Sequence, residues 1–160
     1  MNCPRTSSMG RLFDAVAALC GLPGVISFEG QAAMALEFAA DEECLESYPI
    51  TLSGGEPAVA DWEPLVRGVL ADRAAGVPVA IIAARFHNAL AEMAVAIAGR
   101  TGLTEIVLSG GCFQNFLLAR RVRERLIGAG LRVYSHHQVP PGDGGIALGQ
   151  ILAAARAAKE

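Results

Sequence analysis

Two glycine-containing turns carry the residue types best suited to hold a charged ligand. In the first, Gly110 and Gly111 follow the apolar run 106–108 and precede a helical pattern that begins near Asn115. Adjacent glycines let backbone N–H groups approach a ligand closely, and a helix N-terminus favours negative charge. The lysine and hydroxyl of a Walker A phosphate loop are missing. An ordinary tight turn with Asn115 as the helix cap is the alternative interpretation.

The second turn, PPGDGG, places Asp143 between glycines directly before an apolar helical pattern. A carboxylate there could bind a divalent metal through oxygen or orient a metal-bound phosphate. An aspartate that only caps the helix is the alternative, and the local pattern alone favours it. His136 and His137 have no recognisable ligand spacing from Asp143, so we expect them at the surface.

Two further carboxylates are candidates in the N-terminal part of the chain. Asp14 interrupts the apolar face of a predicted helix, so it should either meet a donor such as a ribose hydroxyl or point to solvent. Glu29 precedes a helix start, where it could approach a ligand or simply complement the helix dipole.

Other polar groups are expected to be structural. His87 lies mid-helix and is interpreted as a packing or capping residue. Cys112 follows the Gly-Gly turn, where a helix N-terminus can lower a thiol pKa, but a small buried residue is the simpler interpretation. Four arginines are expected on the solvated face of one helix: Arg120, Arg121, Arg123 and Arg125. The other side of that helix carries Phe116, Ala119, Val122 and Leu126.

The elements that position the two turns alternate in type. Strands are predicted at 104–108 and 131–135, and helices at about 115–129 and 144–158. This order predicts an α/β domain with two parallel strands and with ligands near their carboxyl ends.

The first 100 residues are expected to be mainly helical. Helices are predicted at 7–20, 30–47, 61–75 and 78–100, with a short strand at 50–52. Apolar residues recur every three or four positions in 78–100, so that helix is predicted to be the centre of the core. In 30–47, an acidic cluster at 41–46 is expected to face water.

Composition excludes several classes of function. A net charge of −3 and a pI near 5.6 give no attraction to nucleic acid. The best candidate membrane span, residues 77–98, contains four costly polar groups, and the N-terminus has no apolar signal stretch, so a cytoplasmic protein is predicted. Four cysteines without a C-x-x-C pair indicate neither a zinc site nor a disulfide framework. An apolar fraction of 52% predicts a face that packs on something else.

Five segments, in order, resemble one family: SSMGRLFDAVAALCGL, ISFEGQAAMALE, AARFHNALA, LSGGCFQNFLL and VPPGDGGIALGQ. They are similar to the C-terminal stretch of the HypF carbamoyltransferases over roughly residues 4–150. The resemblance implies a helix-rich α/β lobe of the actin-like ATPase (ribonuclease H-like) kind, incomplete by itself, with ATP bound between two lobes. It also implies kinship with sugar kinases and with the TsaD proteins that modify tRNA.

The resemblance further implies an activity and a set of site residues. In such proteins carbamoyl phosphate and ATP give a carbamoyl-adenylate, whose carbamoyl group passes to the C-terminal cysteine of a HypE-like acceptor during maturation of nickel-iron hydrogenase. Gly110, Gly111 and Asn115 match the nucleotide-contacting segment, and Asp143 matches a metal-ligating aspartate. Asp14 matches a ribose-contacting acid. Glu29 falls in the loop that approaches the nucleoside, where HypF-like and TsaD-like patterns differ.

Several parts of that family's pattern are not found in this sequence. A histidine-rich metal motif, a glycine-rich phosphate loop and the acylphosphatase-like, zinc-finger and YrdC-like domains are missing. We therefore expect residues 1–160 to be the C-terminal portion of the carbamoyltransferase domain, inactive alone and in need of an upstream lobe or subunit. The alternatives are a TsaD-like or O-carbamoyltransferase, a non-catalytic nucleotide-binding or subunit-docking module, and a sugar-kinase relative.

Overall fold

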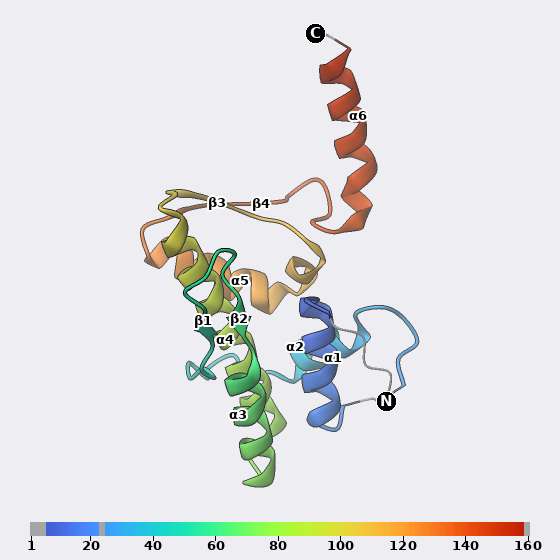
Figure 1. Cartoon of the computed structure of the whole chain (residues 1–160). Helices are drawn as coiled ribbons and strands as arrows, with labels where there is room; N and C mark the ends of the chain where they lie inside the picture. Colours follow the sequence, from blue (N-terminus) through green and yellow to red (C-terminus); the bar gives the residue numbers. More distant parts are fainter. Residues whose placement is uncertain (1–5, 23–24, 159–160) are drawn as a thin grey trace.

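The computed structural model describes residues 6–22 and 25–158, which form a helical body and a small parallel sheet (Figure 1). The elements of the first half are α1 (Met9–Leu19), α2 (Gln31–Ala39), β1 (Thr51–Leu52), β2 (Ala60–Asp61), α3 (Glu63–Ala74) and α4 (Val79–Thr101). Those of the second half are β3 (Glu105–Leu108), the 3-10 turn η1 (Gly111–Gln114), α5 (Phe116–Gly128), β4 (Arg132–Ser135), the 3-10 turn η2 (Asp143–Gly145) and α6 (Ile146–Ala157).

Helix α4 is the centre of the body, as the spacing of its apolar residues predicts. Ile82, Phe86 and Leu90 are buried there, and α2, α3 and α5 all pack on this helix. By length and composition alone, α4 would pass as a membrane span, but half of its most apolar window is buried inside the molecule. Its polar residues have internal partners, which is typical of a core helix.

The predicted β-α-β-α order of the second half is confirmed. Strands β3 and β4 pair in parallel, with Glu105 opposite Arg132 and Leu108 opposite Ser135. Helix α5 connects the two strands and packs mainly on α4, and it also contacts β4. The arrangement brings the carboxyl ends of both strands, and the two glycine-containing turns that follow them, to the same edge of the sheet.

The predicted helix 30–47 is wrong in its second half, because α2 ends at Ala39. The acidic segment that follows is an irregular loop whose backbone is bonded by side chains from other helices. Arg121 donates to the carbonyls of Asp41 and Glu42, and Asn88 donates to those of Cys44 and Glu46. These donors are distant in sequence, so no local pattern could indicate them.

The interpretation of the arginine face is also wrong in part. Arg121 is only 4% exposed and donates a hydrogen bond to the Ala84 carbonyl, whereas Phe116, expected on the buried side, is 73% exposed. Helix α5 therefore lies rotated from the predicted orientation, so that Arg121 joins Leu118 and Val122 at the α4 interface. The free energy of three carbonyl hydrogen bonds offsets the desolvation of the guanidinium.

Strand β2, which was not predicted from the sequence, directly precedes α3. Residues of β2 pair antiparallel with β1, with Thr51 opposite Asp61. Nearby, the Tyr48 ring packs directly on Gly68 of α3, where an added Cβ would lie 2.6 Å from the ring. The Tyr48 hydroxyl donates to Asp72 at 2.6 Å, and Arg85 donates to the same carboxylate, so α3 and α4 are joined by one ion-pair network.

Candidate functional site

The two glycine-containing turns touch each other at the carboxyl ends of β3 and β4. The Gly110 amide donates to the Pro141 carbonyl at 2.7 Å, and Gly110 has φ of 107°, which favours glycine. An added Cβ at Gly142 would lie 3.4 Å from the Cα of Gly111 and 2.7 Å from Nε2 of Gln114. The turns are thus a single loop cluster, held by backbone contact that leaves no room for a side chain at Gly142.

The Asn115 side chain faces inward from this cluster. Its Oδ1 accepts from the Leu118 amide at 2.8 Å, which makes it the N-cap of α5. Its Nδ2 lies 3.1 Å from Nε2 of His87, and the residue is 7% exposed. The capping interpretation is therefore confirmed. Both functional ends of the Asn115 amide have partners within the protein, so any ligand contact at this position would compete with them.

His87, which the sequence analysis interpreted as a packing or capping residue, is the buried partner of Asn115. It has no exposed surface, and the rings of Phe13 and Phe86 meet it edge to face. Its Nδ1 lies 2.7 Å from the Ala83 carbonyl. Burial lowers the pKa of His87 to about 4, and the charge of Arg121 adds to this, although the bond to Ala83 opposes it. The imidazole is neutral at pH 7.

Glu37 of α2 is a second residue at this site, which sequence reasoning missed. Its Oε1 accepts from the Leu117 amide at 3.1 Å. With Leu118 bonded to Asn115, two of the free amides at the start of α5 already have acceptors from the protein. The expectation that this helix N-terminus attracts a ligand's negative charge is therefore weakened, because the Glu37 carboxylate supplies that charge internally.

Asp143 lies in η2 and is exposed. In the chain it follows Pro141 and Gly142, the residues that contact the Gly-Gly turn. Within residues 6–22 and 25–158 there is no group of three His, Cys, Asp or Glu side chains placed to hold a metal ion. Asp143 therefore offers one carboxylate, and the described residues do not by themselves fit a divalent cation site.

The other two predicted carboxylates lie on the α1 and α2 side. Asp14 is partly buried on α1, where its Oδ2 lies 2.9 Å from a guanidinium nitrogen of Arg11 without forming a well-aligned hydrogen bond. Glu29 is exposed in the turn before α2. It precedes Gly30, the N-cap residue of that helix, which has a φ of 83°. Helices α1 and α2 pack on each other. Asp14 lies within this pair of helices, and Glu29 lies in the turn that leads into it.

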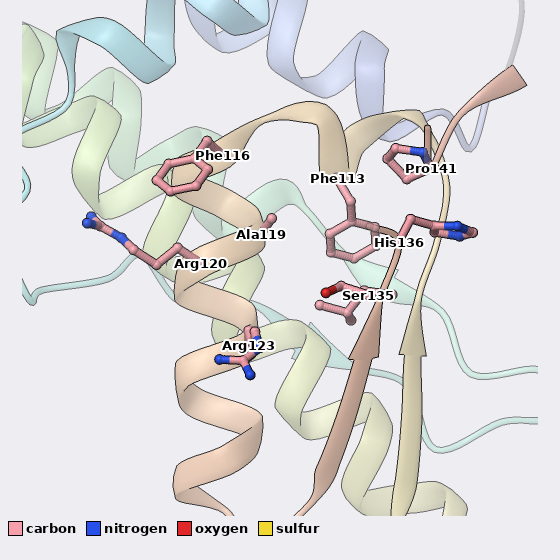
Figure 2. A pocket seen from close by; sticks show the side chains of 9 residues that line it. Phe113, Phe116, Ala119, Arg120, Arg123, Ser135, His136 and Pro141 are labelled. Carbon is pink, nitrogen blue, oxygen red and sulfur yellow. The ribbon is translucent and has the colours of Figure 1, made fainter. Parts of the chain in front are cut away.

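A hollow of about 340 Å³ adjoins the loop cluster on its α5 side (Figure 2). Its lining includes Phe113 and Pro141 from the two turns, Ser135 from the end of β4, and Arg123 from α5. None of the six predicted site residues lines it. Gly110, Gly111, Asn115 and Asp143 thus lie in or beside the two turns, whereas Asp14 and Glu29 lie in and before the helices α1 and α2, and this hollow is a separate feature.

Cys112 within the Gly-Gly turn is half-buried, and burial raises the pKa of its thiol. A raised pKa lowers the thiolate fraction at neutral pH, so Cys112 is not suited to act as a nucleophile. The simpler interpretation, a small structural residue, agrees with this environment.

Comparisons with known proteins bear directly on this arrangement. Residues 1–150 match the family model described as carbamoyltransferase, Kae1-like domain, second subdomain. The chain belongs to the HypF carbamoyltransferase family. Carbamoyltransferase HypF of Synechocystis is 41% identical over 152 residues, which cover 94% of this chain and 20% of that protein. A HypF homolog of Cupriavidus necator is 40% identical and is covered over 42% of its length.

Solved HypF structures share the fold described above. A full-length HypF, crystallised in a phosphate- and nucleotide-bound form, matches with a TM-score of 0.89 and 42% identity over 96% of this chain. HypF of T. kodakarensis matches with a TM-score of 0.77 and 31% identity. The chain spans 21% and 20% of those two proteins, respectively. A helix-rich α/β Kae1-like subdomain of HypF is thus established, as the sequence predicted.

Proposed function

We propose that this chain supplies one wall of the nucleotide site in a HypF carbamoyltransferase. The Gly111 amide of the Gly-Gly turn would face ATP, since the Gly110 amide already donates to the Pro141 carbonyl, and Asp143 would lie beside the phosphates. The observation that carries this proposal is the 2.7 Å bond from the Gly110 amide to the Pro141 carbonyl, which joins the two turns where parallel strands end. One HypF relative was crystallised with a nucleotide, which supports the same ligand class.

The reaction that we propose for the complete protein is carbamoyl transfer in hydrogenase maturation. Carbamoyl phosphate and ATP would give a carbamoyl-adenylate, and the C-terminal cysteine of a HypE-like acceptor would take the carbamoyl group, with AMP leaving. An acyl group on AMP leaves readily, so the protein's task is to bind and orient the adenylate. This chain's part is to hold the nucleoside and phosphate by its turns, with Asp14 and Glu29 as candidate contacts to the nucleoside.

The rest of the site is proposed to come from an upstream lobe of the actin-like ATPase kind. Asp143 is the one predicted metal-binding carboxylate, and the described residues contain no group of three His, Cys, Asp or Glu side chains that could complete a cation site, so no step is routed through a metal. We expect no carbamoyl transfer by these 160 residues alone. A TsaD-like or O-carbamoyltransferase activity is less well supported, because the matching relatives are named HypF.

Isothermal titration calorimetry with ATP, with and without a divalent metal, tests the nucleotide proposal. Gly110→Ala should abolish the heat of binding because the left-handed φ of 107° strains any residue with a Cβ. Asp143→Ala should weaken binding in the presence of metal. Glu124→Ala, which removes an exposed carboxylate on α5, is the matched control. Equal binding by all four proteins would contradict a nucleotide site at these turns, and no heat for the wild type would contradict retained nucleotide binding.

A docking module is the second candidate, and one observation favours it. Helix α6 has no buried residue, and its large apolar side chains Ile146, Leu148, Ile151 and Leu152 are 53 to 67% exposed. Leu148, Ile151 and Leu152 share one face at a spacing of three and four residues, and an exposed apolar face of this kind typically marks an interaction surface. Size-exclusion chromatography with light scattering tests this: a stable monomer that neither self-associates nor binds a supplied upstream lobe would contradict the docking role.

A further inference from the structure

His87 and Asn115 join the middle of the central helix to the end of the Gly-Gly turn. Their side chains meet at 3.1 Å between Asn115 Nδ2 and His87 Nε2, and both residues are buried. A buried polar pair is retained only when its hydrogen bonds are satisfied. The surrounding rings of Phe13 and Phe86 leave no water-exposed alternative for the imidazole.

The direction of this bond is fixed from both ends. Asn115 Oδ1 accepts from the Leu118 amide, so the Nδ2 group must be the end that faces His87. The Ala83 carbonyl can only accept, so His87 Nδ1 must carry the proton. His87 Nε2 is therefore the acceptor for Asn115, and one tautomer of the imidazole satisfies both contacts.

Asn115 in turn closes the turn that carries the two glycines. The backbone N–H of Asn115 donates to the Cys112 carbonyl at 3.2 Å, and the backbone N–H of Phe113 donates to the Gly110 carbonyl at 3.0 Å. We infer that His87 is a positioning residue for this turn: by holding Asn115, it fixes the conformation in which Gly110 bonds to Pro141 and Gly111 presents its amide. The ligand in this inference rests on the proposed function, whereas the link from His87 to the turn does not.

Glu37 anchors the same place independently. It reaches the Leu117 amide from α2, whereas His87 reaches Asn115 from α4. The end of the turn is thus held by two helices that are separated in sequence. Because His87 is the buried anchor, its loss leaves an unsatisfied Asn115 donor that solvent cannot reach.

Amide hydrogen exchange on the full chain tests the mechanical link. His87→Leu keeps an apolar side chain of similar size but accepts no hydrogen bond, whereas the side-chain oxygen of His87→Gln can accept from Asn115. In His87→Leu the amides of Phe113, Asn115 and Leu118 should exchange at least about tenfold faster, and amides of β4 should not change. His87→Gln should restore most of the protection. Unchanged exchange in His87→Leu, or equal loss in both variants, would overturn the inference.

Nitrogen-15 NMR of the histidine rings tests the tautomer. In the wild type, His87 should carry its proton on Nδ1 and none on Nε2, while His136→Gln and His137→Gln serve to assign the exposed rings. Asn115→Asp keeps the helix cap but replaces the donor by an acceptor, so His87 Nε2 should gain a proton. A wild-type His87 protonated on Nε2 would contradict the geometry.

ATP titration separates this inference from the proposed function. Where the wild type binds ATP, His87→Leu should weaken binding by about tenfold or more, and His87→Gln by less than about threefold. If the wild type binds no ATP, the proposed function fails, and the exchange and NMR results still decide whether His87 positions the turn. Equal ATP affinity in the wild type and both variants, despite faster exchange in His87→Leu, would overturn the effect on the nucleotide site.

Discussion

The body around α4 and the C-terminal helix α6 differ in where their side chains find partners. In the body several buried polar residues have internal partners: Asn88 bonds to two loop carbonyls and accepts from Arg125, and Arg121 bonds to three carbonyls. Helix α6 buries none of its residues and extends away from the body (Figure 1). The body is therefore expected to hold the fold, while α6 offers an apolar face that another surface would cover.

Matched leucine substitutions give the largest test of this difference. Leu36 of α2 is fully buried, whereas Leu152 of α6 is 53% exposed. Leu36→Ala should lower the free energy of unfolding by about 2 to 5 kcal/mol, because it removes buried methyl groups and leaves a cavity. Leu152→Ala should change it by less than about 0.5 kcal/mol.

Urea unfolding followed by circular dichroism measures both values. Equal destabilisation by the two substitutions would mean that α6 packs on the body as tightly as α2 does, and would remove the contrast between the regions. A larger effect of Leu152→Ala when a partner lobe is present would instead agree with a docking face.

Much of this contrast could be predicted from the sequence, because long elements have strong local signals. The central helix, the β-α-β-α order and the Asn115 cap all follow from the spacing of apolar residues, glycines and prolines. The surplus of apolar residues agrees with the exposed apolar side chains of α6, although it did not indicate that α6 carries them, and the surface that would cover them stays a prediction.

The rest depends on contacts between residues far apart in the chain. Glu37 reaches Leu117, and Arg121 reaches Asp41, across about 80 positions, so neither role has a local signature. The Arg121 bonds use the carbonyls of Asp41 and Glu42 outside any helix, which agrees with α2 stopping at Ala39 rather than continuing to residue 47. His87 has a recognisable place mid-helix, but only the fold brings Asn115 to it.

The pH dependence of stability is the second test and concerns the body alone. The pKa of His87 is about 4 in the folded protein and about 6.5 in an unfolded chain, so the unfolded state takes up a proton first as the pH falls. The stabilisation from neutral His87 is complete above pH 6.5 and is lost as the pH falls towards 4. The loss amounts to about 3 kcal/mol over that window.

Carboxylates also titrate in that window, so the comparison is between the wild type and His87→Gln. The difference between their free energies of unfolding, measured by urea titration at pH 7, 6, 5 and 4, should shrink or reverse as the pH falls. A difference that stays constant with pH would show that His87 is not buried in its neutral form. The same series with His136→Gln, which replaces an exposed histidine, is the matched control.

Two glycine substitutions test packing within the body at a smaller scale. An added Cβ at Gly68 would lie 2.6 Å from the buried Tyr48 ring, which its hydroxyl fixes to Asp72. Gly68→Ala should therefore destabilise the chain by about 1 to 3 kcal/mol, despite the better helix propensity of alanine. Gly99→Ala in α4 meets nothing within 4 Å and should stabilise by up to about 1 kcal/mol. Thermal unfolding of both variants measures this, and two shifts of the same sign would contradict the Tyr48 contact.

The smallest effect on stability is expected for a substitution in α6, which tests whether this helix unfolds separately from the body. Gly149 lies inside α6 and an added Cβ there meets nothing within 4 Å. Gly149→Ala should therefore stabilise the α6 helix by about 1 kcal/mol and slow amide exchange within it about fivefold. Because α6 buries no residue in the body, the midpoint of global unfolding should not move, whereas Gly99→Ala should raise it. A midpoint that rises equally in both variants would show that α6 unfolds together with the body, so that the two regions form one cooperative unit.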